Sequence, residues 1–273
     1  MQYDAAAIAA AELHFREGIW GAAPHDAVEE LEIRKRWFGP VLATICGGLP
    51  DAPLMNTVQG AAEPGAVADG HLAEALEWMR SREVGYLVQV ASDRPESMAA
   101  EAWLAARGYE QGPTMRRYLR PAAAPSADSE ALVDIRELTA ADTEGMSLIF
   151  AQAVGVSDLA TVPLLGLPEV EGWHCYSAYL DEREVGCGAM LLRDGMAVLG
   201  LDATMPEARH RGCQTALIRR RLVDAVRAGC DVVLAESCDV PTERAAAGRN
   251  FQRAAFFEAG RSVGWRRPPL TPA

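Results

Sequence analysis

Two stretches of the chain share one order of apolar and polar positions. Residues 71–91 show the pattern of an amphipathic helix followed by an apolar strand, and residues 98–121 add a second helix and a final strand. Residues 214–236 and 248–268 repeat this order. Apolar residues at helical spacing mark the buried face of a helix, and a short apolar run between turn residues marks a strand. The sequence therefore predicts two copies of one fold rather than a solenoid.

The second copy has several further elements ahead of its helix at 214. We expect an apolar strand, a helix with Thr139 as N-cap, and three strands, at 131–137, 139–155, 173–180, 184–193 and 196–205. Threonine is a favoured N-cap because its hydroxyl accepts a bond from a free backbone N–H group. The short turns "DERE" and "DG" between the three strands predict an antiparallel meander, which Pro206 ends.

Residues 120–132 separate the two copies and are rich in Pro, Ala and Ser, without a helix or strand period. We expect domains at 1–122 and 131–273, joined by a linker at 123–130. A chain of 273 residues is long enough for two domains of ordinary size. The expected fold class is α+β, each domain having a mixed, mostly antiparallel central sheet flanked by helices.

Composition narrows the class of protein. The net charge is −12 and neither half is basic, which argues against a nucleic-acid partner. The six cysteines form no metal-binding spacing and are typical of reduced thiols, so we expect no metal. We also expect a cytoplasmic protein without a membrane partner, because the sequence shows neither a signal peptide nor a long apolar segment.

Positive charge is concentrated in "RHRGCQTALIRRRL", residues 209–222, where the helix at 214 is about to begin. A helix N-terminus presents unpaired N–H groups and a partial positive charge, so it suits an anion. Arg209, Arg211 and the flexible Gly212 would complete a phosphate cradle. A solvated, arginine-rich turn is the alternative interpretation of the same residues.

The sequence around this loop resembles the GNAT superfamily of acetyl-coenzyme A-dependent N-acyltransferases. The resemblance covers about residues 131–268 and rests on the meander, this loop, the strand "DVVLAE" and the helix "RNFQRAAF". The family signature is Gln/Arg-x-x-Gly-x-Gly/Ala after a strand that ends in Val-x-Pro. Here residues 209–214 follow Thr204-Met205-Pro206, and Gln214 replaces the last small residue. The first half lacks the loop, so the chain resembles two tandem GNAT-like domains, the N-terminal one degenerate.

The resemblance implies acetyl-CoA as cosubstrate, bound in the second domain. Backbone amides from Arg211 to Thr215 would cradle its pyrophosphate, and the backbone near Ala203–Met205 would pair with its pantetheine arm. The three arginines at 219–221 are predicted to be mostly solvated. The expected CoA-binding residues are Ala203, Thr204, Met205, Arg209, His210, Arg211, Gly212, Cys213, Gln214, Thr215, Asn250 and Arg253.

Two carboxylates are the candidates for the catalytic base. Glu236 ends its strand, where the strands of this family splay apart, and Asp202 lies in the neighbouring strand; we favour Glu236 because its longer side chain reaches further. A strand-end carboxylate bonded to nearby amides is the alternative for either residue. The position of the family's tyrosine acid is taken by Phe251, which has no hydroxyl.

The predicted function is transfer of an acetyl group from acetyl-CoA to a primary amine of a small molecule or peptide, by direct attack in a ternary complex. A covalent route through Cys213 or Cys238 is less favoured, because the sequence pairs neither with a histidine. A non-catalytic acyl-CoA sensor or scaffold is the alternative, favoured by Phe251 and Gln214. We expect a monomer or a homodimer.

Overall fold

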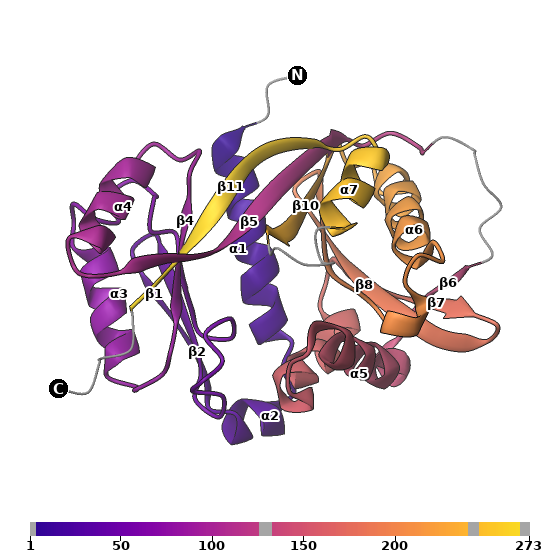
Figure 1. Ribbon diagram of the computed structural model, residues 1–273, viewed down its shortest axis with the longest axis horizontal. Helices are drawn as coiled ribbons and strands as arrows, with labels where there is room; N and C mark the ends of the chain where they lie inside the picture. Colours follow the sequence, from indigo (N-terminus) through magenta and orange to yellow (C-terminus); the bar gives the residue numbers. More distant parts are fainter. Residues whose placement is uncertain (1–3, 126–132, 240–245, 268–273) are drawn as a thin grey trace.

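The structure is a computed structural model that describes residues 4–125, 133–239 and 246–267 (Figure 1). The strands are β1 (Ile33–Phe38), β2 (Val41–Cys46), β3 (Thr57–Gln59), β4 (Leu87–Ala91), β5 (Glu110–Pro121), β6 (Asp134–Glu137), β7 (Trp173–Leu180), β8 (Arg183–Arg193), β9 (Met196–Thr204), β10 (Val232–Asp239) and β11 (Phe257–Arg266). The α-helices are α1 (Ala5–Gly21), α2 (His25–Glu30), α3 (His71–Arg80), α4 (Ser97–Ala105), α5 (Thr143–Val154), α6 (Cys213–Arg227) and α7 (Ala246–Arg253). Three 3₁₀ segments are η1 (Ala140–Asp142), η2 (Asp158–Glu169) and η3 (Pro206–Ala208).

All these strands belong to one mixed sheet, in the order β1-β2-β3-β4-β11-β5-β10-β9-β8-β7-β6. Only β3–β4 and β9–β10 run parallel; the other neighbours are antiparallel. The fold class is therefore α+β, as the sequence predicts.

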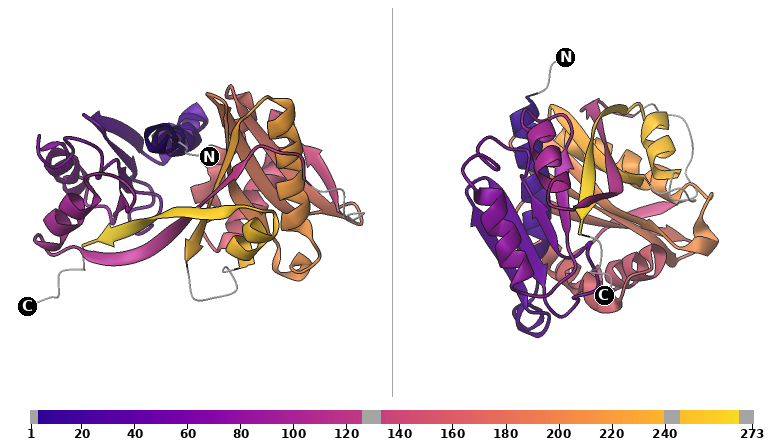
Figure 2. Two further views of the ribbon diagram at one scale, coloured as in Figure 1. Left: turned by 90° about the horizontal axis from the view of Figure 1, so that it is seen from above. Right: turned by 60° about the vertical axis from the view of Figure 1, so that its left-hand side comes forward.

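The last strand of each half pairs with the other half. β5, the last strand of the first half, lies against β10. β11, the last strand of the second half, lies against β4. β5 and β11 also pair with each other and form the long ribbon that joins the two halves (Figures 1 and 2). The sheet therefore does not follow the chain division at 122 and 131, which stays a proposal.

Helices cover the two halves of the sheet differently. In the first half α3 packs on the strands through a fully buried face that includes Leu72, Leu76 and Met79. In the second half α6 and α7 cover one face, and α5 and η2 cover the other (Figure 2). Helix α1 lies between the halves, with Ile8 and Ala11 in the core that α5 and η2 share.

Most predicted elements are confirmed. The meander is β7, β8 and β9, and the helix and strand predicted at 214–236 are α6 and β10. Thr139 does not cap a helix as predicted. It precedes the short η1, and its hydroxyl donates to Asp142 at 2.6 Å instead of accepting a bond from a helix N–H group. The predicted linker lies outside the described residues from residue 126 onward. The start of the strand predicted at 131–137 lies outside them as well.

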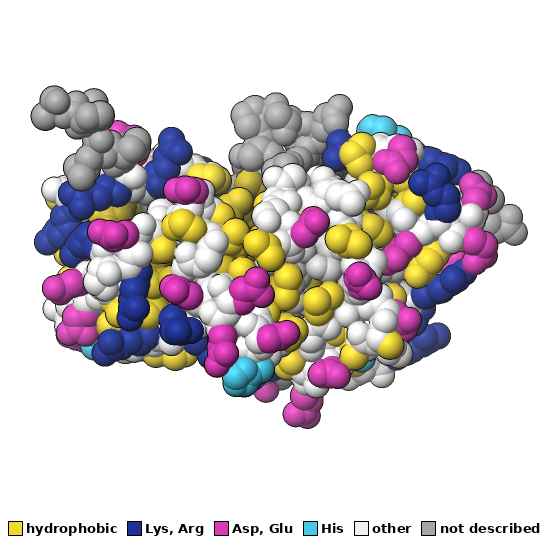
Figure 3. Space-filling view, turned by 90° about the horizontal axis from the view of Figure 1, so that it is seen from below, with side chains coloured by type: hydrophobic (Ala, Val, Ile, Leu, Met, Phe, Trp, Pro, Cys, Tyr) yellow, Lys and Arg dark blue, Asp and Glu magenta, His cyan; other side chains and the backbone are white. Residues whose placement is uncertain are grey.

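Acidic and basic side chains are unevenly spread over the face shown in Figure 3. Asp and Glu lie across the middle of this face, whereas Lys and Arg gather toward its two ends. Hydrophobic side chains are concentrated where the two halves meet. On this face the junction between the halves therefore carries apolar side chains with acidic ones among them.

Candidate active site

Helix α6 begins at the predicted loop, and its first turn is open. Gly212 is the N-cap residue and has a φ of +88°, in the left-handed region that glycine adopts without strain. A Cβ at this position would meet no atom within 4 Å among the described residues. Within the described chain no side chain caps this end of α6, so its first N–H groups are left for another acceptor. This geometry fits an anion close to the backbone.

Two of the predicted arginines flank this helix start. Arg211 is exposed, with its guanidinium 3.7 Å from the still more exposed Asp181, a separation typical of weak surface pairs. Arg209 is half-buried next to η3. Both cations stand within a few residues of the open helix start, so their charge adds to that of the helix dipole.

The structure brings together three of the predicted CoA-binding residues on α6 and α7. The Asn250 side-chain amide donates to Gln214 Oε1 at 2.6 Å, and Arg253 donates to Asn250 Oδ1 at 3.2 Å. Gln214, the residue that departs from the family signature, is thus held by a side chain of the neighbouring helix. The substitution places an amide where α7 meets the start of α6.

Strands β9 and β10 separate beside this helix start. They pair in parallel only from Met196–Leu199 with Val232–Ala235. Beyond these pairs β9 continues against β8 and β10 continues against β5. An irregularity in the β8–β9 register falls here, and Leu201 has a φ of +55°, as expected where a bulge bends a strand. The predicted segment Ala203–Met205 lies on the β9 side of this opening.

Asp202 is tied to a buried arginine. Both Asp202 oxygens accept bonds from Arg221, one of them at 3.2 Å. Arg221 is fully buried and also donates to the carbonyl oxygens of Leu217 and Ala189. The prediction that 219–221 are mostly solvated is therefore wrong for Arg221. The sequence pattern missed its burial because the partner carboxylate comes from β9, far away in the chain.

The prediction that Glu236 ends its strand is wrong, because β10 continues beyond it to Asp239 against β5. Glu236 is the first residue of β10 beyond the parallel pairs, and its side chain turns toward α1. Its carboxylate forms an ion pair with Arg16 of α1, and both side chains are about four-fifths buried, with 19% and 25% of their surface exposed. Arg16 lies one helical turn after Glu12, so both face Glu236 from the same side of α1.

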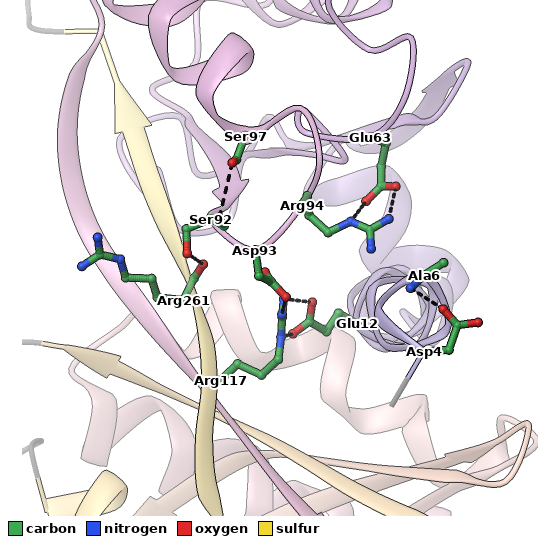
Figure 4. A network of polar contacts seen from close by, with 10 residues as sticks. All are labelled: Asp4, Ala6, Glu12, Glu63, Ser92, Asp93, Arg94, Ser97, Arg117 and Arg261. Atoms are coloured by element: carbon green, nitrogen blue, oxygen red, sulfur yellow. Dashed lines mark hydrogen bonds and ion pairs between the residues drawn. The ribbon is translucent and has the colours of Figure 1, made fainter. Parts of the chain in front are cut away.

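Glu12 is a candidate functional residue that the sequence did not reveal. It accepts two bonds from Arg117 of β5, at 2.5 and 2.6 Å, and Arg117 also donates to Asp93 at 2.5 Å (Figure 4). Burial, together with the charge of Glu236, raises the pKa of Glu12 from 4.5 to about 7, although Arg117 opposes the shift. A carboxyl group with such a pKa exchanges its proton near neutral pH. The signal available in the sequence was the Glu12–Arg16 pair within an alanine-rich helix.

A tyrosine hydroxyl lies beside Phe251. Phe251 is buried and stacks on Tyr118 of β5, with 5.6 Å between the ring centroids. A Cβ added at Gly248 would lie 2.5 Å from the Tyr118 hydroxyl and 3.5 Å from Ser237 Oγ, so these groups share one corner. The exchanged strand β5 thus places a hydroxyl near the position that the family fills from its last helix.

Burial makes three of the cysteine thiols poor nucleophiles. It raises the pKa of the Cys213 thiol, which lies in the loop and points to the Ala208 carbonyl. It also raises the pKa of Cys46 to about 11 and of Cys175 to about 12. A thiol that stays protonated at neutral pH is a weak nucleophile.

The described residues contain neither a metal site nor a helix that could span a membrane. No group of three or more His, Cys, Asp or Glu side chains in this part of the chain is placed to hold a metal ion. Among the same residues, the helices are too short or too polar to cross a bilayer.

Comparison with known proteins identifies the fold. No family model matches the chain, and no curated protein matches it. A GCN5-related N-acetyltransferase from Kribbella flavida is 15% identical, with a TM-score of 0.69 over 98% of this chain and 97% of that one. The corresponding enzyme from Sphaerobacter thermophilus is 18% identical, with a TM-score of 0.61 over 85% of this chain and 79% of that one.

A third solved structure matches both halves of the chain. It is a tandem GNAT protein from the clavulanic acid biosynthesis pathway, 16% identical, with a TM-score of 0.57 over 85% of this chain and 79% of that one. At such identities the likeness concerns the fold. The chain therefore has the fold of the GCN5-related N-acetyltransferases, spread over two halves as in a tandem GNAT protein.

Proposed function

We propose that the protein is an N-acetyltransferase that moves the acetyl group of acetyl-CoA to a primary amine by direct attack in a ternary complex. The observation that carries this proposal is the opening between β9 and β10, with an open helix N-terminus on one side and the Glu12–Glu236 carboxylates on the other. Five thiols, those of Cys46, Cys175, Cys187, Cys213 and Cys230, form no disulfide, which supports a cytoplasmic location. We propose that the chain acts as a monomer or a homodimer.

The residues at the start of α6 fit the phosphates of CoA. The open N–H groups and the nearby Arg209 and Arg211 suit the pyrophosphate, and the absence of a side chain at Gly212 lets it approach the backbone. His210, Cys213 and Thr215 complete the loop, while Ala203, Thr204 and Met205 would pair with the pantetheine arm. We assign Gln214, Asn250 and Arg253 to the CoA side, because they form one hydrogen-bonded group there.

The carboxylate pair supplies the base. The incoming ammonium gives one proton to the Glu12–Glu236 pair; the free amine then attacks the thioester carbon, the C–N bond forms and the C–S bond breaks. The second amine proton ends on the leaving thiolate, so the products are an amide and free CoA thiol. Glu12 and Glu236 lie close enough for the charge of Glu236 to act on Glu12, and Glu236 is the residue at the opening. Asp202 is the less favoured candidate for the base, because Arg221 donates hydrogen bonds to both of its carboxylate oxygens.

We assign Tyr118 as the group that protonates the leaving thiolate. Its hydroxyl lies near Ser237 of β10 and next to the buried ring of Phe251. Tyr118→Phe should lower the turnover number and leave the affinity for acetyl-CoA unchanged. Equal turnover numbers for this variant and the wild type would contradict the assignment of Tyr118 as the acid.

Titration calorimetry with acetyl-CoA, followed by a thiol-release assay, tests the main proposal. We expect one site per chain, because the cationic loop occurs only in the second half. The acceptor panel should contain polyamines, aminoglycosides, amino acids and peptide N-termini. Sustained thiol release with any of them supports the enzyme. Two equal acetyl-CoA sites, or none, would contradict the proposal.

A non-catalytic acyl-CoA sensor is the second candidate. It is favoured by the ion pair that already engages Glu236 and by the missing hydroxyl at Phe251. Tight binding of acetyl-CoA without thiol release across the whole panel would select the sensor. Turnover with one amine would reject it.

A further inference from the structure

A cavity lies between α1 and the first half, and Glu236 forms part of its wall. Its volume is about 50 Å³, several times the roughly 10–15 Å³ that one water molecule requires. It therefore admits a few non-hydrogen atoms, such as the end of a small molecule. Besides Glu236, the residues that matter for the argument are Glu12, Gln59, Gln89 and Ser262.

Gln59 and Gln89 occupy the same kind of position as Glu236. The parallel pairing of β3 and β4 ends at Val58 with Val88, so these two glutamines are the first residues beyond it. Glu236 is likewise the first residue of β10 beyond the parallel pairing of β9 and β10. The cavity thus lies where the strands of the first half separate, and it reaches the opening of the second half.

One residue that lines this cavity has a buried polar atom without a partner among the described residues. Gln59 is 94% buried, its exposed fraction being 6%, and its side-chain amide donates to Thr57 Oγ1 at 3.4 Å. Its Oε1 atom accepts no hydrogen bond from the described part of the chain. By contrast, Gln89 Oε1 accepts from Ser262 Oγ at 3.1 Å. A buried acceptor without a donor is costly, so native proteins seldom keep one unless a water or ligand supplies the donor.

Charged side chains line both sides of the cavity. Glu12, Arg16 and Glu236 lie on the side of α1 and β10. A second ion pair, Arg94 with Glu63, lies on the side of the first half, with 2.8 Å from Arg94 Nε to Glu63 Oε1 (Figure 4). Each carboxylate has a guanidinium partner, so the cavity is polar but not strongly charged. A ligand with a cationic amine and a neutral polar end fits this distribution.

We propose that this cavity is the acceptor site and that it selects small primary amines carrying a hydroxyl or amide N–H donor at their far end. The donor would bond to Gln59 Oε1 while the amine faces Glu12 and Glu236. The inference rests on the function proposed above and gives the first half a role in acceptor specificity. Gln59 is then a specificity-determining residue that contacts the acceptor.

The test uses linear amino alcohols of three to six carbons and the alkylamines in which a methyl group replaces the hydroxyl. Binding to the full chain with CoA present is measured by calorimetry, and acetyl transfer is measured by thiol release. The wild type should bind the best amino alcohol about tenfold more tightly than its alkylamine, as expected for one hydrogen bond to a buried acceptor. Gln59→Met should remove this preference, and the exposed control Gln111→Met should keep it.

A third variant protects the test against misfolding. Gln59→Glu keeps the shape and the acceptor oxygens but adds a negative charge, so it should prefer linear diamines over the amino alcohols by at least tenfold. Either this switch or the loss of preference in Gln59→Met supports the inference.

The outcomes separate the two proposals. Selective binding without turnover would leave the acceptor site standing and reject the transferase. If acetyl transfer occurs but the wild type, Gln59→Met and Gln111→Met all show the same preference for the amino alcohol over its alkylamine, the proposed acceptor site is wrong. The proposed transferase activity then still stands. Absence of binding by every amine in the series would also overturn the acceptor site.

Discussion

The two halves of the molecule start their central helices in the same way but surround them with different side chains. Gly70 precedes α3 with a φ of +83°, and Gly212 precedes α6 with a φ of +88°, both open to solvent. Next to Gly70 the chain carries Asp69, whereas Arg211 stands next to Gly212. An anion is repelled at the first helix and attracted at the second. The backbone of the fold thus provides the helix start twice, and single charges decide whether it suits a phosphate.

The positions where the strands separate differ in the same manner. The first half places the amides of Gln59 and Gln89 just beyond its parallel pair, and the second half places Gly200 and Glu236 there. Amides hold a neutral ligand group, whereas a carboxylate takes up protons. In the proposed mechanism the first half holds the far end of the acceptor through these amides, and the second half supplies Glu236 at the strand opening.

The largest effect should come from making the second half resemble the first at the strand opening. Glu236→Gln should lower the turnover number roughly 10²–10⁴-fold, because a positioned base is lost. The affinity for acetyl-CoA, measured by calorimetry, should stay nearly unchanged. Glu74→Gln on the exposed face of α3 is the matched control. Wild-type turnover in Glu236→Gln, with a crippled but folded Asp202→Asn, would transfer the role to Asp202.

The second change removes the buried charge that distinguishes α6 from α3. Arg221→Met leaves the Asp202 carboxylate without its main partner, so the free energy of unfolding should fall by about 3–5 kcal/mol. Arg227→Met, whose side chain is 74% exposed, should change stability by less than about 0.5 kcal/mol. Urea unfolding of both variants measures the difference. Equal stability would show that the Asp202–Arg221 pair does not support the second half.

The third change concerns the helix that separates the halves. The unfolded chain binds the Glu12 proton only below a pKa of 4.5, whereas the folded chain keeps it up to about 7. Glu12 therefore lowers the free energy of unfolding as the pH rises across this window, by about 3 kcal/mol in full. Glu12→Gln should lose this decline, so its stability relative to the wild type should improve between about pH 5 and about pH 8.

Urea unfolding at both pH values measures this shift. Glu17→Gln, on the same helix, is the control and should follow the wild type; among the described residues Glu17 forms an ion pair with Lys35 alone. An unchanged difference between Glu12→Gln and the wild type across the window would mean that Glu12 is ionised throughout it.

The fourth change gives the loop before α6 a negative charge, like that of Asp69 in the loop before α3. Arg211→Glu should weaken acetyl-CoA binding by about 1–3 kcal/mol, because a charge-assisted contact is replaced by repulsion. Arg193→Glu, at the exposed end of β8, should bind acetyl-CoA like the wild type. Calorimetry compares the two. Equal losses in both variants would indicate a general charge effect rather than a phosphate site.

The smallest effect should come from the loop cysteine. Cys213→Ala should keep the turnover number within about twofold, because its thiol is buried and its pKa is raised. Thiol release under saturating acetyl-CoA measures it. A folded variant without activity would replace direct attack by a covalent route.

Sequence reasoning succeeded where the signal is local. The meander, α6 and the open loop follow from hydrophobic period, turn residues and one short signature, all within about fifty residues. The buried state of Arg221 could not be predicted, because the three consecutive arginines are alike in the sequence and only β9 supplies the partner of one of them. Glu12 was missed for a similar reason, since its partner Arg117 belongs to β5. The sequence also did not reveal that β5 and β11 each pair with the other half, because both are the last strand of their half and share the same pattern.

The exchanged strands also set an order of events during synthesis. Ser262 of β11 bonds to Gln89 of β4 across 173 residues, so the edge of β4 stays unpaired until β11 has left the ribosome. Contacts between such distant segments form slowly, and an exposed strand edge invites pairing with other chains. The first half therefore depends on β11 for its completion. Newly made chains should need protection from aggregation until β11 arrives.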